Sequence, residues 1–383
     1  MVLASSHSPG ARSIKVLIVD DSPFMRASLS RMVESDDGLC VVGTAETGLE
    51  GLAKIGTLYP DVVTLDIDMP GLDGIETLKR IMEESPLPVI IVSSLARKGA
   101  EATLEALRLG AFDCIAKQLT YATEDVITVQ EELVAKIKAA AGPRFHRRAS
   151  SAASLSLSSP SPAGKRPPRG AQKSGFRPAT KPAVITIAAS TGGPTALEGL
   201  LRALPLDLPV GILVVQHMPV GFIGALAERL NSVCRLRVRE AKDRDLIKAG
   251  HVYIAPAGKH MIVRRRTASE VYVHLPLTPT KDLHVPSADV MMSSVADVFR
   301  AAAMGIVLTG MGNDGAAGMR AIFREGGLTL GQDQESCVVY GMPRACAESG
   351  VLHQVVPLSD IPLHILAALH YQKGRGRGTA SGR

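Results

Sequence analysis

A short turn between a strand-like and a helix-like stretch constrains the second half of this chain more than any other feature. Residues 183–187 are apolar and mostly β-branched, which predicts a buried strand. The next segment, Ala188-Ala189-Ser190-Thr191-Gly192-Gly193-Pro194, ends in a proline, which is favoured in the first turn of a helix. Residues 195–201 continue with helical spacing. We therefore expect Ser190 on a tight strand-to-helix turn at the carboxyl edge of a sheet.

Three uses of this turn are open at this point. Gly192 and Gly193 permit a positive φ and close approach by another segment. The start of the following helix offers N–H groups to a negative charge. Ser190 is therefore a candidate nucleophile, the turn is a candidate phosphate site, and a simple loop of small residues is the third interpretation.

Length and composition indicate two aliphatic domains. The chain has 383 residues, 46% of them hydrophobic and only 3% aromatic. No apolar run reaches the ~18 residues that a membrane span needs, and residues 1–13 lack the apolar core of a signal peptide. The five cysteines show no C-x-x-C spacing, which speaks against a disulfide framework or a zinc site. We expect a cytoplasmic protein that is not embedded in a membrane.

The positive net charge of +6 belongs to one segment of the chain. Residues 141–181 hold nine of the 43 basic residues and no acidic one, so the remainder has 34 basic and 37 acidic residues. A basic segment of this kind is typical of a solvated linker, with a weak contact to an anionic surface as the second interpretation. We expect no nucleic-acid partner.

The first domain is expected at residues 14–140. Five strand-like runs alternate there with helical segments, the second of them expected from Glu46 to Leu58. Five β/α units of this length predict an α/β fold with a parallel sheet and helices on both faces. Ligands of such sheets bind at the carboxyl ends of the strands.

Polar side chains stand at those strand ends: Asp20, Asp21, Asp66, Ser93 and Lys117. Three carboxylates at one edge repel each other and favour a hard divalent cation, for which Mg²⁺ fits best. A carboxylate beside such an ion can accept a phosphoryl group. Lys117 would balance the added charge, and Ser93 could donate a hydrogen bond to it. A single Asp at a strand end is more often a loop cap, but five polar residues at successive elements make that interpretation unsatisfactory.

These residues resemble the receiver domain of bacterial response regulators, which has a (βα)₅, flavodoxin-like fold. The matching segments are Val19-Asp20-Asp21-Ser22, Thr64-Leu65-Asp66-Ile67-Asp68-Met69-Pro70, Asp73-Gly74, Val92-Ser93-Ser94 and Ala116-Lys117. The resemblance implies that Asp66 is the phospho-acceptor, that Asp20 and Asp21 hold Mg²⁺ together with the backbone at Asp68, and that a histidine kinase is the phosphodonor. One departure is Gln118, where the family usually has proline.

A linker is expected at 141–182, a catalytic domain at 183–372 and a disordered tail at 373–383. The linker is rich in Ser, Pro and basic residues and lacks apolar periodicity. Strands and helices alternate again from 183 to 324, with short strands in the middle and a helix expected from Ser287 to Ala302. The second domain should therefore be α/β and mostly parallel, with an antiparallel hairpin.

Ser190, His217 and Asp314 each follow a predicted strand of this domain. That placement suits a nucleophile, a base that takes its proton and a carboxylate that orients the base. Taken singly, His217 could be a structural histidine and Asp314 an N-cap of the following helix. Together the three residues favour a catalytic triad. Their chain order, and Ala188 in place of the first glycine of G-x-S-x-G, argue against an ordinary lipase or esterase fold.

The second domain resembles the catalytic domain of chemotaxis protein-glutamate methylesterases. The matching segments are Ala189-Ser190-Thr191-Gly192-Gly193-Pro194, Gln216-His217-Met218-Pro219, Tyr253-Ile254-Ala255-Pro256 with Gly258-Lys259-His260, Pro286-Ser287-Ala288-Asp289, and Thr309-Gly310-Met311-Gly312-Asn313-Asp314-Gly315. The family usually has glycine where Ala188 and Ala257 stand.

This second resemblance implies a Rossmann-like esterase domain that needs no cofactor. It would remove methyl groups from glutamate γ-methyl esters of chemoreceptors, releasing methanol, with deamidation of receptor glutamines as a further activity. The implied triad is Ser190, His217 and Asp314, and the oxyanion is held by backbone N–H groups near Thr191 and Met311. The phosphodonor would then be the chemotaxis histidine kinase.

Two other functions compete with this interpretation. One is a response regulator whose second domain binds a partner or nucleic acid without catalysis, although a binding domain has no need of the Ser190, His217 and Asp314 set. The other is a hydrolase of small esters in which the first domain serves only for dimerisation. Equal activity on free small esters and on receptor esters would favour that alternative.

Overall fold

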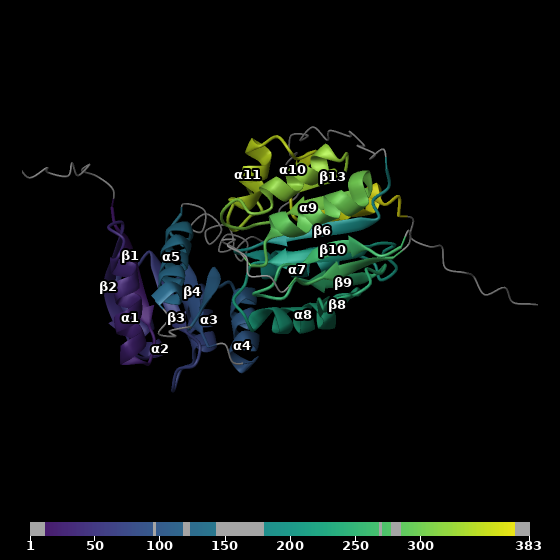
Figure 1. Cartoon of the computed structure of the whole chain (residues 1–383). Coiled ribbons are helices and arrows are strands. Elements are labelled where there is room, and N and C mark those ends of the chain that lie inside the picture. The colour runs from purple at the N-terminus through teal and green to yellow at the C-terminus, as the bar shows by residue number, and fades with distance from the viewer. Residues whose placement is uncertain are drawn as a thin grey trace, which may run out of the picture. The chain divides into compact units, whose positions relative to one another are not determined.

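The chain forms two compact α/β units, each built on its own parallel sheet. The computed structural model describes residues 12–94, 97–117, 123–142, 180–267, 270–276 and 285–371 (Figure 1). The N-terminal unit runs from β1 to α5, and the C-terminal unit runs from β6 to α12. Both sheets agree with the α/β fold that the sequence predicts.

The N-terminal sheet has five parallel strands in the order β2-β1-β3-β4-β5. The strands are β1 (Ile14–Val19), β2 (Leu39–Ala45), β3 (Val62–Asp66), β4 (Val89–Ser93) and β5 (Asp113–Ala116). The helices are α1 (Pro23–Glu34), α2 (Gly48–Leu58), α3 (Gly74–Glu84), α4 (Arg97–Arg108) and α5 (Thr123–Ala140). Helix α1 packs against α5, and α3 packs against α2 and α4, so helices cover both faces of the sheet.

Helix starts in this unit follow from side-chain caps. Ser22 Oγ accepts the N–H of Met25, and Asp73 caps α3 in the same way. Helix α2 begins two residues later than predicted, at Gly48 rather than Glu46. The reason is that Thr47 stays extended and its Oγ1 accepts the N–H of Glu50 at 3.2 Å, which makes Thr47 the cap.

The C-terminal unit has a seven-stranded sheet in the order β14-β13-β12-β6-β7-β9-β8, parallel throughout. Its strands are β6 (Val184–Ala189), β7 (Gly211–Gln216), β8 (Arg237–Glu240), β9 (His251–Ile254), β12 (Ala303–Val307), β13 (Leu328–Gln332) and β14 (Gln354–Val356). The expected antiparallel hairpin is present as a separate pair, β10 (Ile262–Arg265) and β11 (Val271–His274).

Among the described residues, the helical segments that accompany these strands are α7 (Gly193–Arg202), α8 (Phe222–Val233), α9 (Ala288–Phe299), the 3₁₀ turn η1 (Arg300–Ala302), α10 (Ala316–Arg324), α11 (Met342–Glu348) and α12 (Ile361–Ala368). The single helix expected to end at Ala302 is therefore two elements, because Arg300 takes a left-handed φ of 49°. The sequence analysis predicted none of the elements after Arg324.

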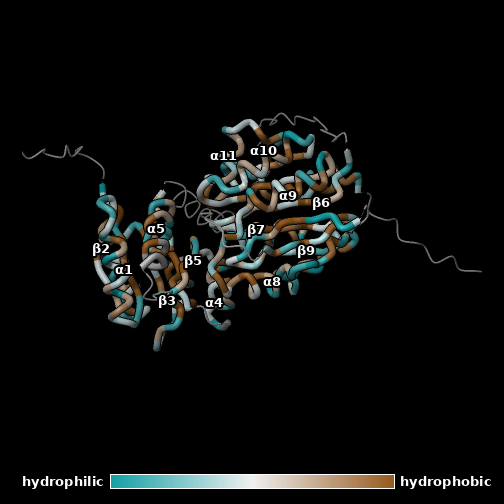
Figure 2. Tube along the Cα trace, in the orientation of Figure 1, coloured by the Kyte–Doolittle hydropathy of each residue, from teal (hydrophilic) through white to brown (hydrophobic). Residues whose placement is uncertain are grey.

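Alternating strand side chains build a core on both faces of the C-terminal sheet. Val184 and Ala188 belong to a buried cluster that includes residues of α9, α10 and the hairpin. Ile185 and Ile187 point to the opposite face, because neighbouring side chains of a strand alternate, and both are fully buried. Figure 2 shows the resulting apolar stretches along β7 and β9. Among the described residues, no helix is long and apolar enough to cross a membrane.

Truncation of Ile187 tests this packing. We expect Ile187→Ala to lower the free energy of unfolding by about 2–5 kcal/mol, because it leaves a cavity beneath the strand that carries Ser190. Urea denaturation of the full chain, followed by circular dichroism, measures the change. Leu206→Ala is the matched control, since Leu206 is 63% exposed and should change stability by no more than about 0.5 kcal/mol. Equal losses in the two variants would contradict the two-sided core.

Candidate functional sites

Ser190 and His217 follow two neighbouring strands at equivalent positions. Ala189 of β6 and Gln216 of β7 are register partners, so the next residue of each strand emerges at the same sheet edge. The backbone N–H of His217 donates to the carbonyl of Ala189 at 3.0 Å. Ser190 N–H donates to the carbonyl of Thr309, which follows the other neighbour, β12, at 3.1 Å. The sheet therefore places the candidate nucleophile between the strand ends that lead to the other two triad candidates.

His217 and Asp314 are in direct contact. His217 Nε2 lies 2.8 Å from Asp314 Oδ2, although the two residues are 97 positions apart in the chain. An ionised carboxylate only accepts hydrogen bonds, so Nε2 carries the hydrogen and donates it. In this tautomer Nδ1 is the basic nitrogen of His217. The structure thus brings together the base and the carboxylate that the sequence proposed.

The Asp314 carboxylate is held at the start of α9 rather than at the start of its own following helix. Ser287 Oγ and the N–H of Asp289 each donate to Oδ1 at 2.9 Å, and the N–H of Ala288 donates to Oδ2 at 2.6 Å. The alternative interpretation of Asp314 as the N-cap of α10 is wrong, since Gly315 occupies that position. Asp314 does accept the Gly315 N–H at 3.1 Å.

These donors decide the charge of Asp314. Burial alone would raise the pKa of this carboxyl group, because the side chain is almost inaccessible to water. The hydrogen bonds from His217, Asp289 and Ala288 outweigh burial and hold the pKa well below its ordinary value. Asp314 is therefore ionised at neutral pH and can stabilise a positive charge on His217.

The turn after β6 uses its two glycines for different reasons. Gly192 has a φ of 77°, which a residue with a side chain adopts only with strain. Gly193 allows close approach, since a Cβ there would lie 1.9 Å from Gln216 Oε1. The expected helix start is confirmed, because α7 begins at Gly193 with proline in its first turn.

Two buried polar side chains near Ser190 were not singled out from the sequence as site residues. Gln216 Nε2 donates to the carbonyl oxygens of Ser190 and His217, both at 2.9 Å. Thr309 Oγ1 donates to the carbonyl of Thr191 at 2.9 Å and accepts the N–H groups of two residues in the loop after β13. Both residues stand at strand ends inside the quoted motifs, which is the signal that could have identified them.

The two oxyanion candidates lie on the loops that flank Ser190. Thr191 is buried directly after Ser190, and Met311 is half-buried on the loop between β12 and α10. Gly310, next to Met311, has no room for a side chain, because a Cβ there would be 2.8 Å from Ser190 Cβ. The loop backbone therefore runs directly against the candidate nucleophile.

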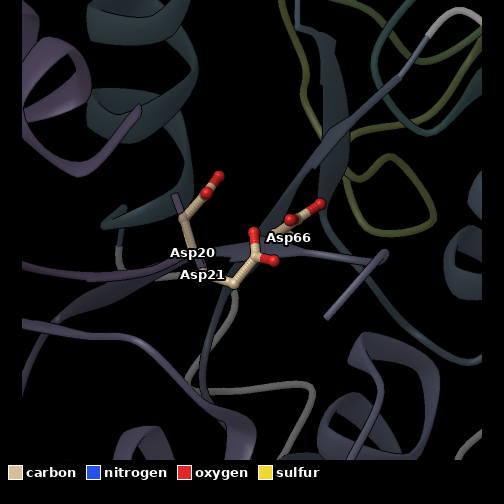
Figure 3. Close-up of side chains that lie close together, drawn as sticks. All are labelled: Asp20, Asp21 and Asp66. Atoms are coloured by element: carbon tan, nitrogen blue, oxygen red, sulfur yellow. The ribbon is translucent and has the colours of Figure 1, made fainter. Parts of the chain in front are cut away.

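The N-terminal unit gathers three carboxylates at the carboxyl ends of β1 and β3. Asp20, Asp21 and Asp66 each offer an oxygen within 4.8 Å of the others (Figure 3). Lys117, which follows β5, places Nζ 2.6 Å from Asp66 Oδ2 and 3.0 Å from Asp20 Oδ2. Burial, reinforced by the charge of Asp20, raises the pKa of Asp66, and Lys117 opposes that rise.

Two other residues predicted for this site, Ser93 and Asp68, direct their side chains to neighbouring groups instead of to the three carboxylates. Ser93 is buried at the end of β4, where its hydroxyl donates to the carbonyl of Gly99 at 3.2 Å. Asp68 directs its backbone N–H to Asp66 Oδ1 at 3.2 Å, while its side chain accepts a hydrogen bond from Ser94. Gln118 lies outside the described residues.

This acidic set fits a divalent cation. Hard cations such as Mg²⁺ prefer oxygen ligands, and two of the three carboxylates, Asp20 and Asp66, are withdrawn from solvent with one lysine for compensation. Asp21 is exposed, which leaves the cluster open on one side. The arrangement can therefore hold a cation, with Asp21 on its open side.

Comparison with known proteins identifies the family of each unit. A family model described as CheB methylesterase matches residues 185–365, and one described as response regulator receiver domain matches residues 16–127. A protein-glutamate methylesterase/protein-glutamine glutaminase of Oleidesulfovibrio alaskensis is 42% identical over 93% of this chain and 100% of its own length. A protein of the same name from Symbiobacterium thermophilum is 45% identical over 91% of this chain and 95% of its own. The chain therefore belongs to the family of protein-glutamate methylesterases that join a response regulator receiver domain to a CheB methylesterase domain.

Proposed function

We propose that Ser190, His217 and Asp314 hydrolyse glutamate γ-methyl esters of chemoreceptors under the control of phosphorylation at Asp66. The observation that carries the catalytic part is the 2.8 Å contact between His217 Nε2 and Asp314 Oδ2 beside the strand end that bears Ser190. The chemotaxis histidine kinase is the proposed phosphodonor. We place the reaction in the cytoplasm.

The proposed reaction is an acyl transfer in two steps. His217 Nδ1 takes the Ser190 hydroxyl proton as Oγ attacks the ester carbonyl carbon, and the imidazolium is stabilised by ionised Asp314. The tetrahedral intermediate collapses to an acyl-Ser190 ester, and methanol leaves with the proton from His217. Water, activated by the same base, then releases the receptor glutamate. A receptor glutamine would follow the same path with ammonia as the leaving group.

The chain itself supplies the groups for these steps. Backbone N–H groups at Thr191 and Met311 are the proposed donors to the oxyanion, since both loops border Ser190. A serine nucleophile with a histidine base requires no cofactor in the proposed reaction. Gln216 holds the carbonyls of both Ser190 and His217, which fixes the backbones that carry nucleophile and base.

In the N-terminal unit, Asp20, Asp21, Asp66 and the backbone at Asp68 would hold Mg²⁺, which would neutralise charge on the incoming phosphoryl group. Asp66 is the proposed phospho-acceptor, because it stands in the receiver-like motif at the end of β3 and its Oδ2 lies nearer to Lys117 Nζ, at 2.6 Å, than Asp20 Oδ2 does, at 3.0 Å. Ser93 would turn its hydroxyl from Gly99 toward the phosphoryl group. The proposed domain limits are 14–140 and 183–372, with the linker at 141–182 between them.

Substitution of the nucleophile tests the esterase. We expect Ser190→Ala to lower methanol release from methylated receptor by at least ~10³-fold, because the hydroxyl forms the acyl intermediate. His217→Ala should lose a similar amount, and the double variant scarcely more. Ser232→Ala is the matched control, since Ser232 is an exposed serine on α8. More than a tenth of the activity remaining in Ser190→Ala would refute the assignment, and equal activity on small free esters would refute the substrate class.

Substitution of the phospho-acceptor tests the receiver site. We expect acetyl phosphate with Mg²⁺ to label the wild-type chain and to raise its esterase activity, whereas Asp66→Asn should show neither effect. Mass spectrometry of the adduct locates the modified residue. Asp37→Asn removes an exposed carboxylate of the same unit and should behave as wild type. The same adduct on another residue of Asp66→Asn would contradict the role of Asp66.

Removal of the receiver tests how phosphorylation acts. The linker gives the two domains a high effective concentration relative to each other, so even a weakly binding receiver can block access of the substrate to Ser190. We expect deletion of residues 1–142 to raise methanol release about tenfold above the unphosphorylated full chain, in the range of ordinary allosteric coupling. Unchanged activity after deletion would show that the receiver recruits the enzyme rather than inhibits it.

A further inference from the structure

Two carboxylates near His217, those of Asp314 and Asp289, link the starts of α9 and α10. Asp314 precedes α10 but binds the start of α9, and Asp289 lies in α9 but binds α10. Asp314 stands two positions before α10, but its oxygens accept the N–H groups of Ala288 and Asp289 at the start of α9. Asp289 is in the first turn of α9, and its Oδ1 accepts the N–H of Gly318 in α10 at 2.7 Å. The two helix starts are therefore linked in both directions.

The packing at this crossing leaves little freedom. A Cβ added to Gly318 would lie 2.5 Å from Met292 Cβ and 3.2 Å from Asp289 Cα, so the two helices meet almost backbone to backbone. Helices α9 and α10 pack closely along this contact. A shift of α10 relative to α9 would carry the loop that bears Asp314 with it, because that loop leads directly into α10.

The pair also brings a second carboxylate close to Asp314, which itself contacts His217. Burial raises the pKa of Asp289, and the charge of Asp314 adds to that rise, while the Gly318 N–H opposes it. Other titratable or charged groups near Asp314 and Asp289 are His217, His260, Cys346 and Arg320. The Nδ1 of His260 accepts the Ser287 N–H. Burial and the charge of Asp289 raise the pKa of Cys346, and Arg320 opposes that rise. The N-termini of α9 and α10 supply the compensating positive ends of two helix dipoles.

We propose that Asp289 is a positioning residue of the esterase, which locks α10 against α9 so that Asp314 keeps its contact with His217. Its carboxylate also places a second negative charge next to Asp314, which helps to stabilise a positive charge on His217. The inference rests on the proposed function of Ser190, His217 and Asp314. Asp289 has no part in attacking the ester.

Two substitutions of Asp289 separate its hydrogen bond from its charge. Asn retains an oxygen that accepts the Gly318 N–H, so Asp289→Asn should keep kcat within about threefold of wild type. Loss of the negative charge destabilises a positive charge on the His217 ring, so the acid limb of kcat/KM should move to lower pH. Ala removes the acceptor, and Asp289→Ala should lower kcat about tenfold or more, with little change in KM.

Glu325→Gln is the matched control. Glu325 is the C-cap residue of α10, at the end away from Asp314, where it pairs with Arg300, and its substitution removes one negative charge at that end of the helix. We expect its kcat and pH profile to match wild type. All variants are assayed as full chains for methanol release from methylated receptor between pH 5 and 9, with circular dichroism to confirm folding.

The outcomes distinguish this inference from the proposed function. Ser190→Ala, measured in parallel, must abolish activity, and if it does not, the proposed function itself fails. If Ser190→Ala is inactive while Asp289→Ala has the kcat and pH profile of wild type, the positioning role is overturned. An unshifted acid limb in Asp289→Asn, or an equal shift in Glu325→Gln, overturns the electrostatic part. Should Asp289→Ala fail to fold, the pH profile of Asp289→Asn decides.

Discussion

The parallel pairing of neighbouring strands is the constraint on which both functional sites depend. In a parallel sheet all strands end at the same edge, so residues that are far apart in the chain emerge side by side. In the C-terminal sheet this alignment sets Ser190 and His217 after paired positions of β6 and β7. In the N-terminal sheet it gathers Asp20, Asp66 and Lys117 after β1, β3 and β5.

The loops that follow the strands of the C-terminal sheet lie so close together that some positions have no room for a side chain. Gly193 gives room to Gln216, and Gly310 gives room to Ser190, in both cases because a Cβ would overlap a neighbouring atom. The polar groups released by these tight turns are bound within the protein, for example by Gln216 Nε2, which donates to both the Ser190 and the His217 carbonyls. The backbone around the candidate nucleophile is thereby held before any substrate arrives, as efficient acyl transfer requires.

The surroundings of the buried carboxylates in the two sites shift their pKa in opposite directions. Asp314 receives hydrogen bonds from His217 and from the start of α9, which hold its pKa low and keep it charged. Around Asp66, burial and the charge of Asp20 outweigh Lys117 and the backbone N–H of Asp68, so its pKa is raised. The first arrangement suits a permanent anion that orients a base. The second suits a carboxylate whose environment is completed by a cation and a phosphoryl group.

The sequence by itself determined the α/β class, the parallel sheets, the turn around Ser190 and the placement of Ser190 and His217 directly after strands, whereas Asp314 lies seven residues beyond β12, just before α10. These features depend on local patterns: β-branched runs, helical spacing, and glycine or proline at turns. It could not show that Asp314 binds the start of α9, that His217 uses Nε2, or that Asp289 reaches into α10. It also left out β13, β14, α11 and α12, which are short. Only the tertiary structure decided these points, because each depends on contacts between segments that are distant in the chain, such as the 97 positions that separate His217 from Asp314.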